Sequence, residues 1–121
     1  MGQPNKVSVL LVEDDPMLAL VLEESLDQLG YAVSDKVARV ADALIRVERR
    51  GFDVALVDVN LGGEDSFAVA DRLLAQGVPF VFTTGYRANS IPDRFEGVPL
   101  MTKPFRHRDI DAALKQLEGA L

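Results

Sequence analysis

Hydrophobic residues in this chain gather into five short, unbroken runs separated by more polar stretches. The runs are "VSVLLV" at 7–12, "YAVSD" at 31–35, "VALVD" at 54–58, "PFVFTT" at 79–84 and "PLMT" at 99–102. A strand with one solvated face alternates apolar and polar positions, whereas a parallel strand covered on both faces is apolar throughout. The pattern therefore predicts five strands of a buried parallel sheet.

The stretches between these runs repeat their hydrophobic residues with the period of an α-helix. Comparable stripes follow four of the five runs, and the first contains Met17, Val21, Leu22, Leu26 and Leu29. Between 86 and 98 the pattern is interrupted by Pro92, so only a short or irregular helix is expected there. Strand and helix alternate five times, which predicts an α/β domain with right-handed crossovers.

Polar residues follow the apolar runs at the places where parallel strands would end. They are Glu13, Asp14 and Asp15, then Asp58, then Thr83 and Thr84, and finally Thr102 and Lys103. Parallel strands bring their carboxyl ends to one edge of the sheet, where α/β proteins bind ligands. Asp15, followed by a proline, is expected to cap a helix instead of contributing to a site.

The residues expected at this edge suit phosphoryl transfer. Clustered carboxylates repel one another unless a cation offsets them, and Mg²⁺ prefers such oxygen ligands. Lys103 would supply a fixed positive charge and Thr84 a hydroxyl donor. The reaction needs an in-line nucleophile and positive charge around the transferred oxygens, and Asp58 could be that nucleophile.

Composition excludes several other chemistries. The 121 residues are 48% hydrophobic and 26% charged, which fits one globular domain. The absence of cysteine excludes thiolate sites, and a single histidine, His107, excludes a His-rich metal site. A net charge of −6 predicts no direct nucleic-acid binding. No apolar run approaches the length of a membrane span and "MGQPNK" is no secretory signal, so a cytoplasmic location is expected.

Four motifs in order, "VLLVEDDP", "VALVDVNLGG", "FTTGY" and "MTKPF", resemble those of the receiver domain of two-component response regulators, the CheY-like fold. The resemblance covers about residues 7–118, and 1–121 is interpreted as a single receiver domain. It implies a five-stranded parallel sheet of order 2-1-3-4-5 flanked by five helices. It also implies that Asp58 accepts a phosphoryl group from a sensor histidine kinase or histidine phosphotransfer protein, and that a protein-binding face responds to it. A signalling domain that is not a turnover enzyme is expected.

The resemblance also assigns roles to individual residues. Glu13, Asp14 and Asp58 match the carboxylates that bind Mg²⁺, and Asn60 matches the position whose backbone carbonyl is a further ligand. The phosphate-binding pair corresponds to Thr84 and Lys103, and the next residue, Pro104, to a proline that typically follows a cis bond.

One position departs from the family pattern. Many receivers carry Tyr or Phe three positions before the lysine, and this chain has Leu100 there. Tyr86, two positions after Thr84, is either a switch element that replaces the missing aromatic residue or a packed loop residue.

Three other functions are weighed against a working receiver. A small phosphatase with Asp58 as its nucleophile would need a second carboxylate two residues after Asp58 to serve as general acid, and this chain has Asn60 there. A flavin- or nucleotide-binding module would want a Gly- or Ser/Thr-rich first loop, which here is acidic. A degenerate receiver that only makes contacts would have lost members of the set Glu13, Asp14, Asp58, Thr84 and Lys103, which is intact.

Overall fold

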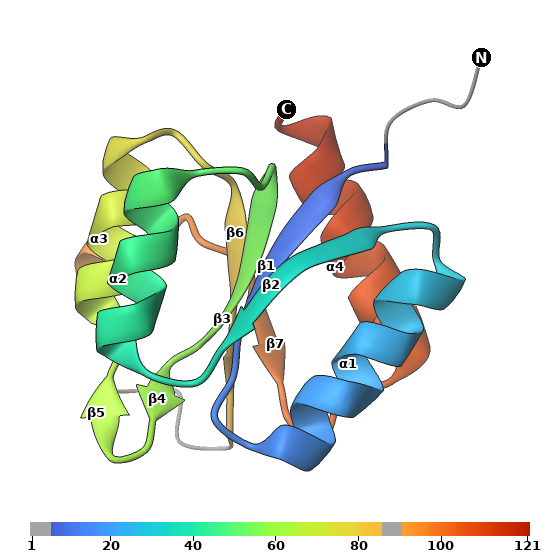
Figure 1. Ribbon diagram of the computed structural model, residues 1–121, viewed down its shortest axis with the longest axis horizontal. Coiled ribbons are helices and arrows are strands. Elements are labelled where there is room, and N and C mark those ends of the chain that lie inside the picture. The colour runs from blue at the N-terminus through green and yellow to red at the C-terminus, as the bar shows by residue number, and fades with distance from the viewer. Residues whose placement is uncertain (1–5, 86–90) are drawn as a thin grey trace.

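The computed structural model describes residues 6–85 and 91–121 and places a five-stranded sheet at their centre. The sheet consists of β1 (Ser8–Val12), β2 (Ala32–Val37), β3 (Val54–Asp58), β6 (Phe80–Thr84) and β7 (Leu100–Thr102). Its strands are parallel and lie in the order β2-β1-β3-β6-β7 (Figure 1). Counted along the chain within this sheet, the order is 2-1-3-4-5, which confirms the expectation.

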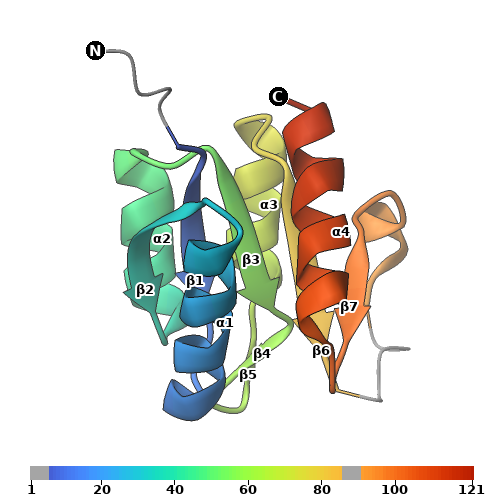
Figure 2. The ribbon, with the colours of Figure 1, turned by 90° about the vertical axis from the view of Figure 1, so that its right-hand side faces the viewer.

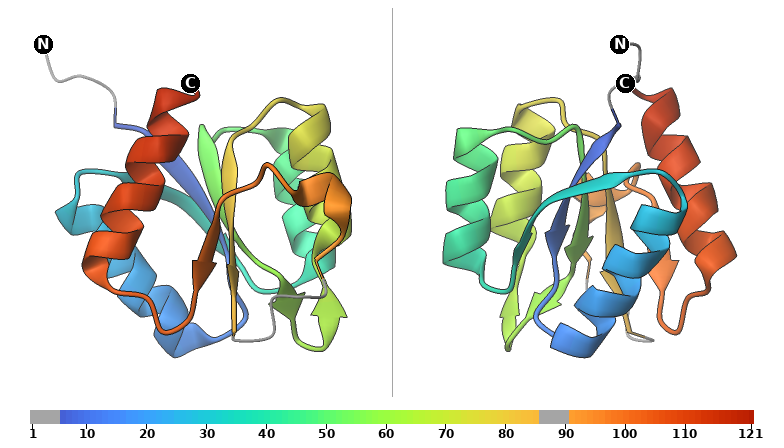
Figure 3. Two further views of the ribbon diagram at one scale, coloured as in Figure 1. Left: turned by 180° about the vertical axis from the view of Figure 1, so that it is seen from behind. Right: turned by 45° about the vertical axis from the view of Figure 1, so that its right-hand side comes forward.

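Helices cover both faces of the sheet. On one face lie α1 (Pro16–Gln28) and α4 (His107–Gly119), and on the other lie α2 (Val40–Arg49) and α3 (Phe67–Ala75) (Figures 1 and 3). Each layer of helices encloses its own hydrophobic cluster against the sheet. β3 is buried along its whole length, as its unbroken apolar sequence requires. No helix in the part of the chain that is described has the length and apolar character needed to cross a membrane.

Local signals fix the ends of these helices. The Asp15 carboxylate accepts hydrogen bonds from the backbone N–H groups of Met17 (3.0 Å) and Leu18 (3.4 Å), which confirms Asp15 as the N-cap of α1. After α1, Gly30 has a φ of +92°. This left-handed conformation is one that a residue with a Cβ rarely adopts, so glycine suits the helix end.

The helix count differs from the expected five. The described residues contain four α-helices. The short or irregular helix expected between 86 and 98 is, in the described stretch from 91 to 98, a three-residue 3₁₀ helix, η2 (Asp93–Phe95). Pro92 precedes it in an extended conformation, and proline lacks the N–H that would continue a helix back toward residue 91. Phe95 is 2% exposed and belongs to the hydrophobic cluster beneath α2 and α3. The ribbon of η2 lies beside α3 in this layer (Figure 3).

The register of the sheet brings its carboxyl ends level. Val12 of β1 pairs with Val57, and Asp58 at the end of β3 pairs with Thr83. Thr84, the last residue of β6, pairs with Thr102 of β7. Four strands therefore deliver the residues that follow them to one edge of the sheet.

Removing side-chain volume from the strand that carries Asp58 should destabilise the fold strongly. Leu56 is 1% exposed in β3, so Leu56→Ala leaves a cavity in the core and should lower the free energy of unfolding by about 2–5 kcal/mol. Leu74 on α3 is 45% exposed, so Leu74→Ala is the control and should cost under about 1 kcal/mol. Urea unfolding midpoints at constant m-value measure both. Equal losses in the two variants would contradict the burial of β3.

Candidate functional site

The carboxyl edge of the sheet opens into a cleft of about 920 Å³. All six residues predicted for the site line it: Glu13, Asp14, Asp58, Asn60, Thr84 and Lys103. They stand at or just after the carboxyl ends of β1, β3, β6 and β7, and so meet because of the strand register and not because of proximity in sequence. Tyr86, the other candidate, lies outside the described residues.

Asp58 is held from both sides at the floor of this cleft. It is 3% exposed, and its Oδ2 accepts a hydrogen bond from Lys103 Nζ at 2.6 Å. Its Oδ1 accepts another from the backbone N–H of Asn60 at 3.0 Å. The carboxylate is therefore fixed in direction, and buried charge is tolerated because a cation pairs with it.

Glu13 is the second buried carboxylate of the cleft and lacks a full set of partners. It is 5% exposed, and its Oε2 accepts from the Asp15 N–H at 3.1 Å. Its Oε1 lies 3.6 Å from Lys103 Nζ, beyond hydrogen-bond distance, and has no hydrogen-bond partner among residues 6–85 and 91–121. Burial, aided by the nearby charge of Asp58, raises the pKa of Glu13 to about 7, although the Asp15 N–H and Lys103 act in the opposite direction.

Asp14 completes a group of three carboxylates. Glu13, Asp14 and Asp58 each offer an oxygen, and these oxygens lie within 4.8 Å of one another. Asp14 is exposed, and its Oδ2 accepts from the Gly62 N–H at 2.9 Å. An unpartnered buried oxygen on Glu13 and three converging carboxylates form a donor set that fits a hard divalent cation such as Mg²⁺.

Thr84 and Lys103 lie together on the other side of Asp58. The Lys103 N–H donates to the Thr84 carbonyl at 2.7 Å, which fixes the two residues side by side across β6 and β7. Burial opposes the charged form of Lys103, but the hydrogen bond and charge of Asp58 outweigh it and raise the pKa of Lys103 above its ordinary value. The lysine therefore stays cationic in the cleft. The Lys103–Pro104 bond is cis, as the resemblance implied.

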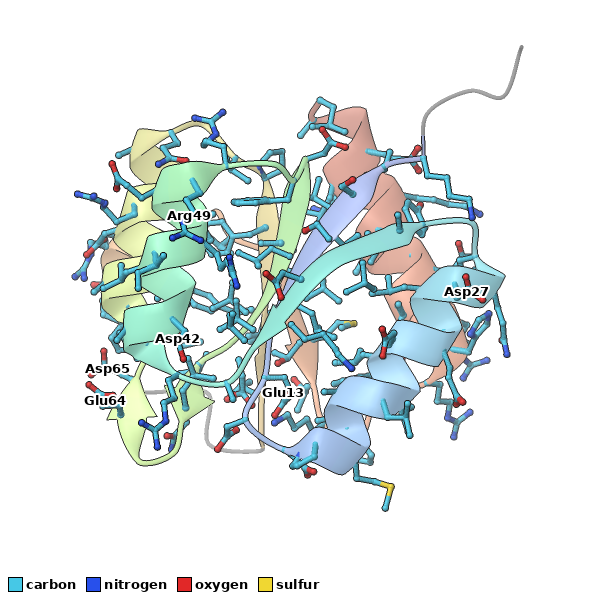
Figure 4. The ribbon with its side chains drawn as sticks, viewed as in Figure 1. Glu13, Asp27, Asp42, Arg49, Glu64 and Asp65 are labelled. Carbon is cyan, nitrogen blue, oxygen red and sulfur yellow. The ribbon has the colours of Figure 1, made fainter. Side chains whose placement is uncertain are left out.

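Sequence reasoning missed a small hairpin at the border of the cleft. β4 (Asn60–Leu61) and β5 (Glu64–Asp65) pair antiparallel beside the end of β3 (Figure 2), and Figure 4 shows Glu64 and Asp65 at the end of the molecule where Glu13 lies. The signal was present, because a Gly-Gly pair between two short runs is typical of a tight hairpin turn. Gly62 and Gly63 have φ values of +59° and +89°, as such a turn requires.

The contact of Ser66 with Asp58 and the position of Phe67 at the cleft were also missed. Ser66 is fully buried and donates from Oγ to the main-chain carbonyl of Asp58 at 2.6 Å. Phe67, the first residue of α3, lines the cleft. The sequence assigned Phe67 only to the apolar stripe of the helix predicted after residues 54–58, and Ser66 follows an acidic turn without a pattern that distinguishes it from loop residues.

The raised pKa of Glu13 predicts how metal-free protein responds to pH. Between its ordinary pKa of 4.5 and its folded value of about 7, folded chains bind more protons at Glu13 than unfolded chains. The free energy of unfolding should therefore fall as the pH rises through this window, by up to about 3 kcal/mol. The stabilisation is complete below the unfolded pKa and is lost as the pH passes the folded one.

Urea denaturation in EDTA at a series of pH values measures this effect. Glu13→Gln retains the shape of the side chain but cannot ionise. The free energy of unfolding should therefore fall less steeply with rising pH in this variant than in the wild type. Identical slopes in the two proteins would show that Glu13 has an ordinary pKa.

Comparison with known proteins agrees with this site and fold. SdrG of Sphingomonas melonis Fr1, known from its solution structure, is 42% identical, with a TM-score of 0.84 over 96% of this chain and 99% of that one. The receiver domain of the sensor histidine kinase PA1611 of Pseudomonas aeruginosa PAO1 is 27% identical, with a TM-score of 0.82 over 95% and 99% of the two chains. That crystal structure has a magnesium ion coordinated in its active site cleft.

Sequence relatives extend beyond the length of this chain. The transcriptional regulatory protein TcrA of Mycobacterium tuberculosis is 33% identical over 123 residues, which cover 96% of this chain and 47% of TcrA. The chain thus spans about half the length of the curated relatives that it matches. The family model of the response regulator receiver domain matches residues 9–115. With the strand order and the acidic cleft, this match shows that the chain belongs to the response regulator receiver domain family.

Proposed function

We propose that this receiver domain takes a phosphoryl group onto Asp58 and uses it to switch a protein-binding face. The arrangement around Asp58 is the observation that carries the proposal. Its carboxylate is buried at the end of a rigid strand, 2.6 Å from the Lys103 ammonium, and has an oxygen within 4.8 Å of oxygens of Glu13 and Asp14.

Asp58 is the nucleophile of this reaction. One of its carboxylate oxygens attacks phosphorus, the new P–O bond makes an acyl phosphate, and the bond from phosphorus to the donor, a phosphohistidine nitrogen, breaks. The histidine leaves with the electron pair of that bond and is protonated. Lys103 and Thr84 hold the transferred oxygens, with the ammonium offsetting their charge and the hydroxyl donating a hydrogen bond.

Mg²⁺ is the proposed cofactor, held by Glu13, Asp14, Asp58 and the backbone carbonyl of Asn60. Bound there, it would offset the repulsion between the carboxylates and an incoming phosphoryl group. The Oε1 of Glu13, which has no hydrogen-bond partner in the described part of the chain, and the raised pKa of this carboxyl group support the assignment, since both mark a carboxylate whose charge Lys103 offsets only in part.

The proposed phosphodonor is a sensor histidine kinase or a histidine phosphotransfer protein, and the proposed recipient of the signal is a downstream protein. Relatives support both kinds of partner, because one is the receiver domain of a sensor histidine kinase and another is a transcriptional regulatory protein. The domain remains in the cytoplasm in this proposal and binds no nucleic acid itself. It is not a turnover enzyme, because the side chain that it phosphorylates and dephosphorylates is its own.

Asp58→Asn should abolish phosphorylation without loss of the fold, because the amide cannot act as the nucleophile. We expect wild-type protein with acetyl phosphate and Mg²⁺ to gain the mass of one phosphoryl group, and the variant to gain none. Intact-mass spectrometry measures the adduct, and a parallel reaction in EDTA tests the requirement for Mg²⁺.

Asp53→Asn is the matched control, since Asp53 accepts from the Ser8 N–H at 2.8 Å near the opposite end of β3. It should be phosphorylated like the wild type. An acid-labile adduct that persists in Asp58→Asn would exclude Asp58 as the acceptor.

Lys103→Ala should separate cation binding from phosphoryl transfer. The carboxylates remain, so Mg²⁺ should still bind, while loss of the ammonium should slow adduct formation by about tenfold or more. Lys115→Ala is the control, because Lys115 pairs with Asp111 on the exposed side of α4. Mg²⁺ titration and the time course of the adduct give the two readouts. An unchanged rate in Lys103→Ala would remove the lysine from the mechanism.

A further inference from the structure

A buried serine connects the candidate acceptor to the start of α3. Ser66 Oγ donates to the main-chain carbonyl of Asp58 at 2.6 Å and lies 3.2 Å from the carbonyl of Val59. The Ser66 N–H also donates to the Val59 carbonyl at 2.9 Å. These hydrogen bonds join the main chain at Asp58 directly to Ser66, the residue that precedes Phe67 at the start of α3.

The Phe67 side chain continues this connection toward η2. Its ring stacks on that of Phe95, with 5.6 Å between centroids and an interplanar angle of 28°. Phe82 of β6 meets both rings edge to face, at 6.2 Å from Phe67 and 5.3 Å from Phe95. These three residues form an aromatic cluster with one end at the cleft, which Phe67 lines, and the other in η2.

The segment from 91 to 98 is attached to α3 through this end of the cluster. Arg94 forms a two-pronged ion pair with Asp71 of α3, at 2.8 and 3.1 Å, and its guanidinium lies 4.6 Å from the centre of the Phe95 ring. The ion pair is about half exposed and is worth little by itself in water. Phe95, at 2% exposure, supplies the buried contact.

The alternative path along β7 has no ring at its centre. Leu100, where many receivers have an aromatic residue, is 43% exposed. An exposed leucine can change rotamer without displacing a neighbour, whereas a ring packed among other rings cannot move without them. By contrast, the hydrogen bond of Ser66 and the stacked rings of Phe67 and Phe95 form a continuous series of contacts from Asp58 to residues 91–98.

We propose that Phe67 is a positioning residue through which phosphorylation of Asp58 changes the conformation of residues 91–98. The inference rests on the proposed function, since it assumes that Asp58 is the acceptor. Phosphorylation converts the Asp58 carboxylate into an acyl phosphate, so Lys103 exchanges its 2.6 Å hydrogen bond to the carboxylate for the phosphoryl oxygens. This exchange changes the forces on the end of β3 and biases the Phe67–Phe95 stack through Ser66. Residues 91–98 then form part of the face that reports phosphorylation.

The test compares phosphorylation with the response of the segment. In isotope-labelled protein with acetyl phosphate and Mg²⁺, intact mass gives the adduct, and backbone amide chemical shifts give the response of residues 91–98. In samples phosphorylated to the same extent, as intact mass shows, the phosphorylation-dependent shift changes at 91–98 should be smaller in Phe67→Leu than in the wild type by about twofold or more.

Phe80→Leu is the matched control. Phe80 is 3% exposed and packs edge to face on Phe82 at 5.3 Å, but it begins β6, away from the cleft. This variant loses a buried ring next to the same cluster, so any general loosening of the core appears in it too. It should retain both the adduct and the shift changes at residues 91–98.

A wild-type response of residues 91–98 in phosphorylated Phe67→Leu would overturn the inference and leave the proposed function standing. A wild-type protein that gains no adduct would overturn both. If thermal melting shows that Phe67→Leu is unfolded, the test uses the wild-type protein instead. The chemical shifts of the Phe67 and Phe95 ring resonances are then compared before and after phosphorylation. Rings that keep their chemical shifts while the amides of 91–98 change would overturn the inference, and rings that change with those amides would support it.

Discussion

Two carboxylates buried side by side are the constraint on which this structure depends. Asp58 and Glu13 are 3% and 5% exposed, and the Lys103 ammonium lies 2.6 and 3.6 Å from their oxygens. Burial disfavours both negative charges, and one cation offsets only part of them, so the pKa of Glu13 is raised. Added positive charge is therefore favourable in the cleft. A phosphoryl group would add negative charge at the same point, so cation binding and phosphorylation would favour each other.

Such a cluster requires strands that cannot slide against one another. A shift of one residue between neighbouring strands would turn every side chain to the other face of the sheet. Here both faces are covered, and β3 is buried in full, so its register with β1 and β6 is fixed by packing along its length. The apolar strand that precedes Asp58 is in this sense part of the site, because it sets where the carboxylate stands relative to Glu13 and Lys103.

The parts of the structure that were predictable from sequence are those with a local or repeating signal. Unbroken apolar runs predicted the sheet, and strand ends predicted the gathering of Asp58, Thr84 and Lys103. The prediction of one apolar face for α1 was partly wrong, because two residues assigned to that face, Met17 and Val21, are 72% and 46% exposed. Periodicity identifies an apolar face but not what covers it. The contacts of Ser66 with Asp58 and of Phe67 with Phe95 could not be predicted, since they join residues brought together only by the fold.

The contrast between Leu100 and Phe95 bears on how this receiver domain differs from those with an aromatic residue on the last strand. A side chain can transmit a displacement only if its surroundings leave it few alternative positions. Leu100 is on an edge strand with solvent beside it, whereas Phe95 is enclosed by the rings of Phe67 and Phe82 and by the Arg94 guanidinium. The packing is therefore tighter on the α3 side of the sheet than at Leu100. A change at Asp58 that spreads through packed contacts reaches residues 91–98 from the beginning of α3, and the missing ring on β7 does not interrupt that path.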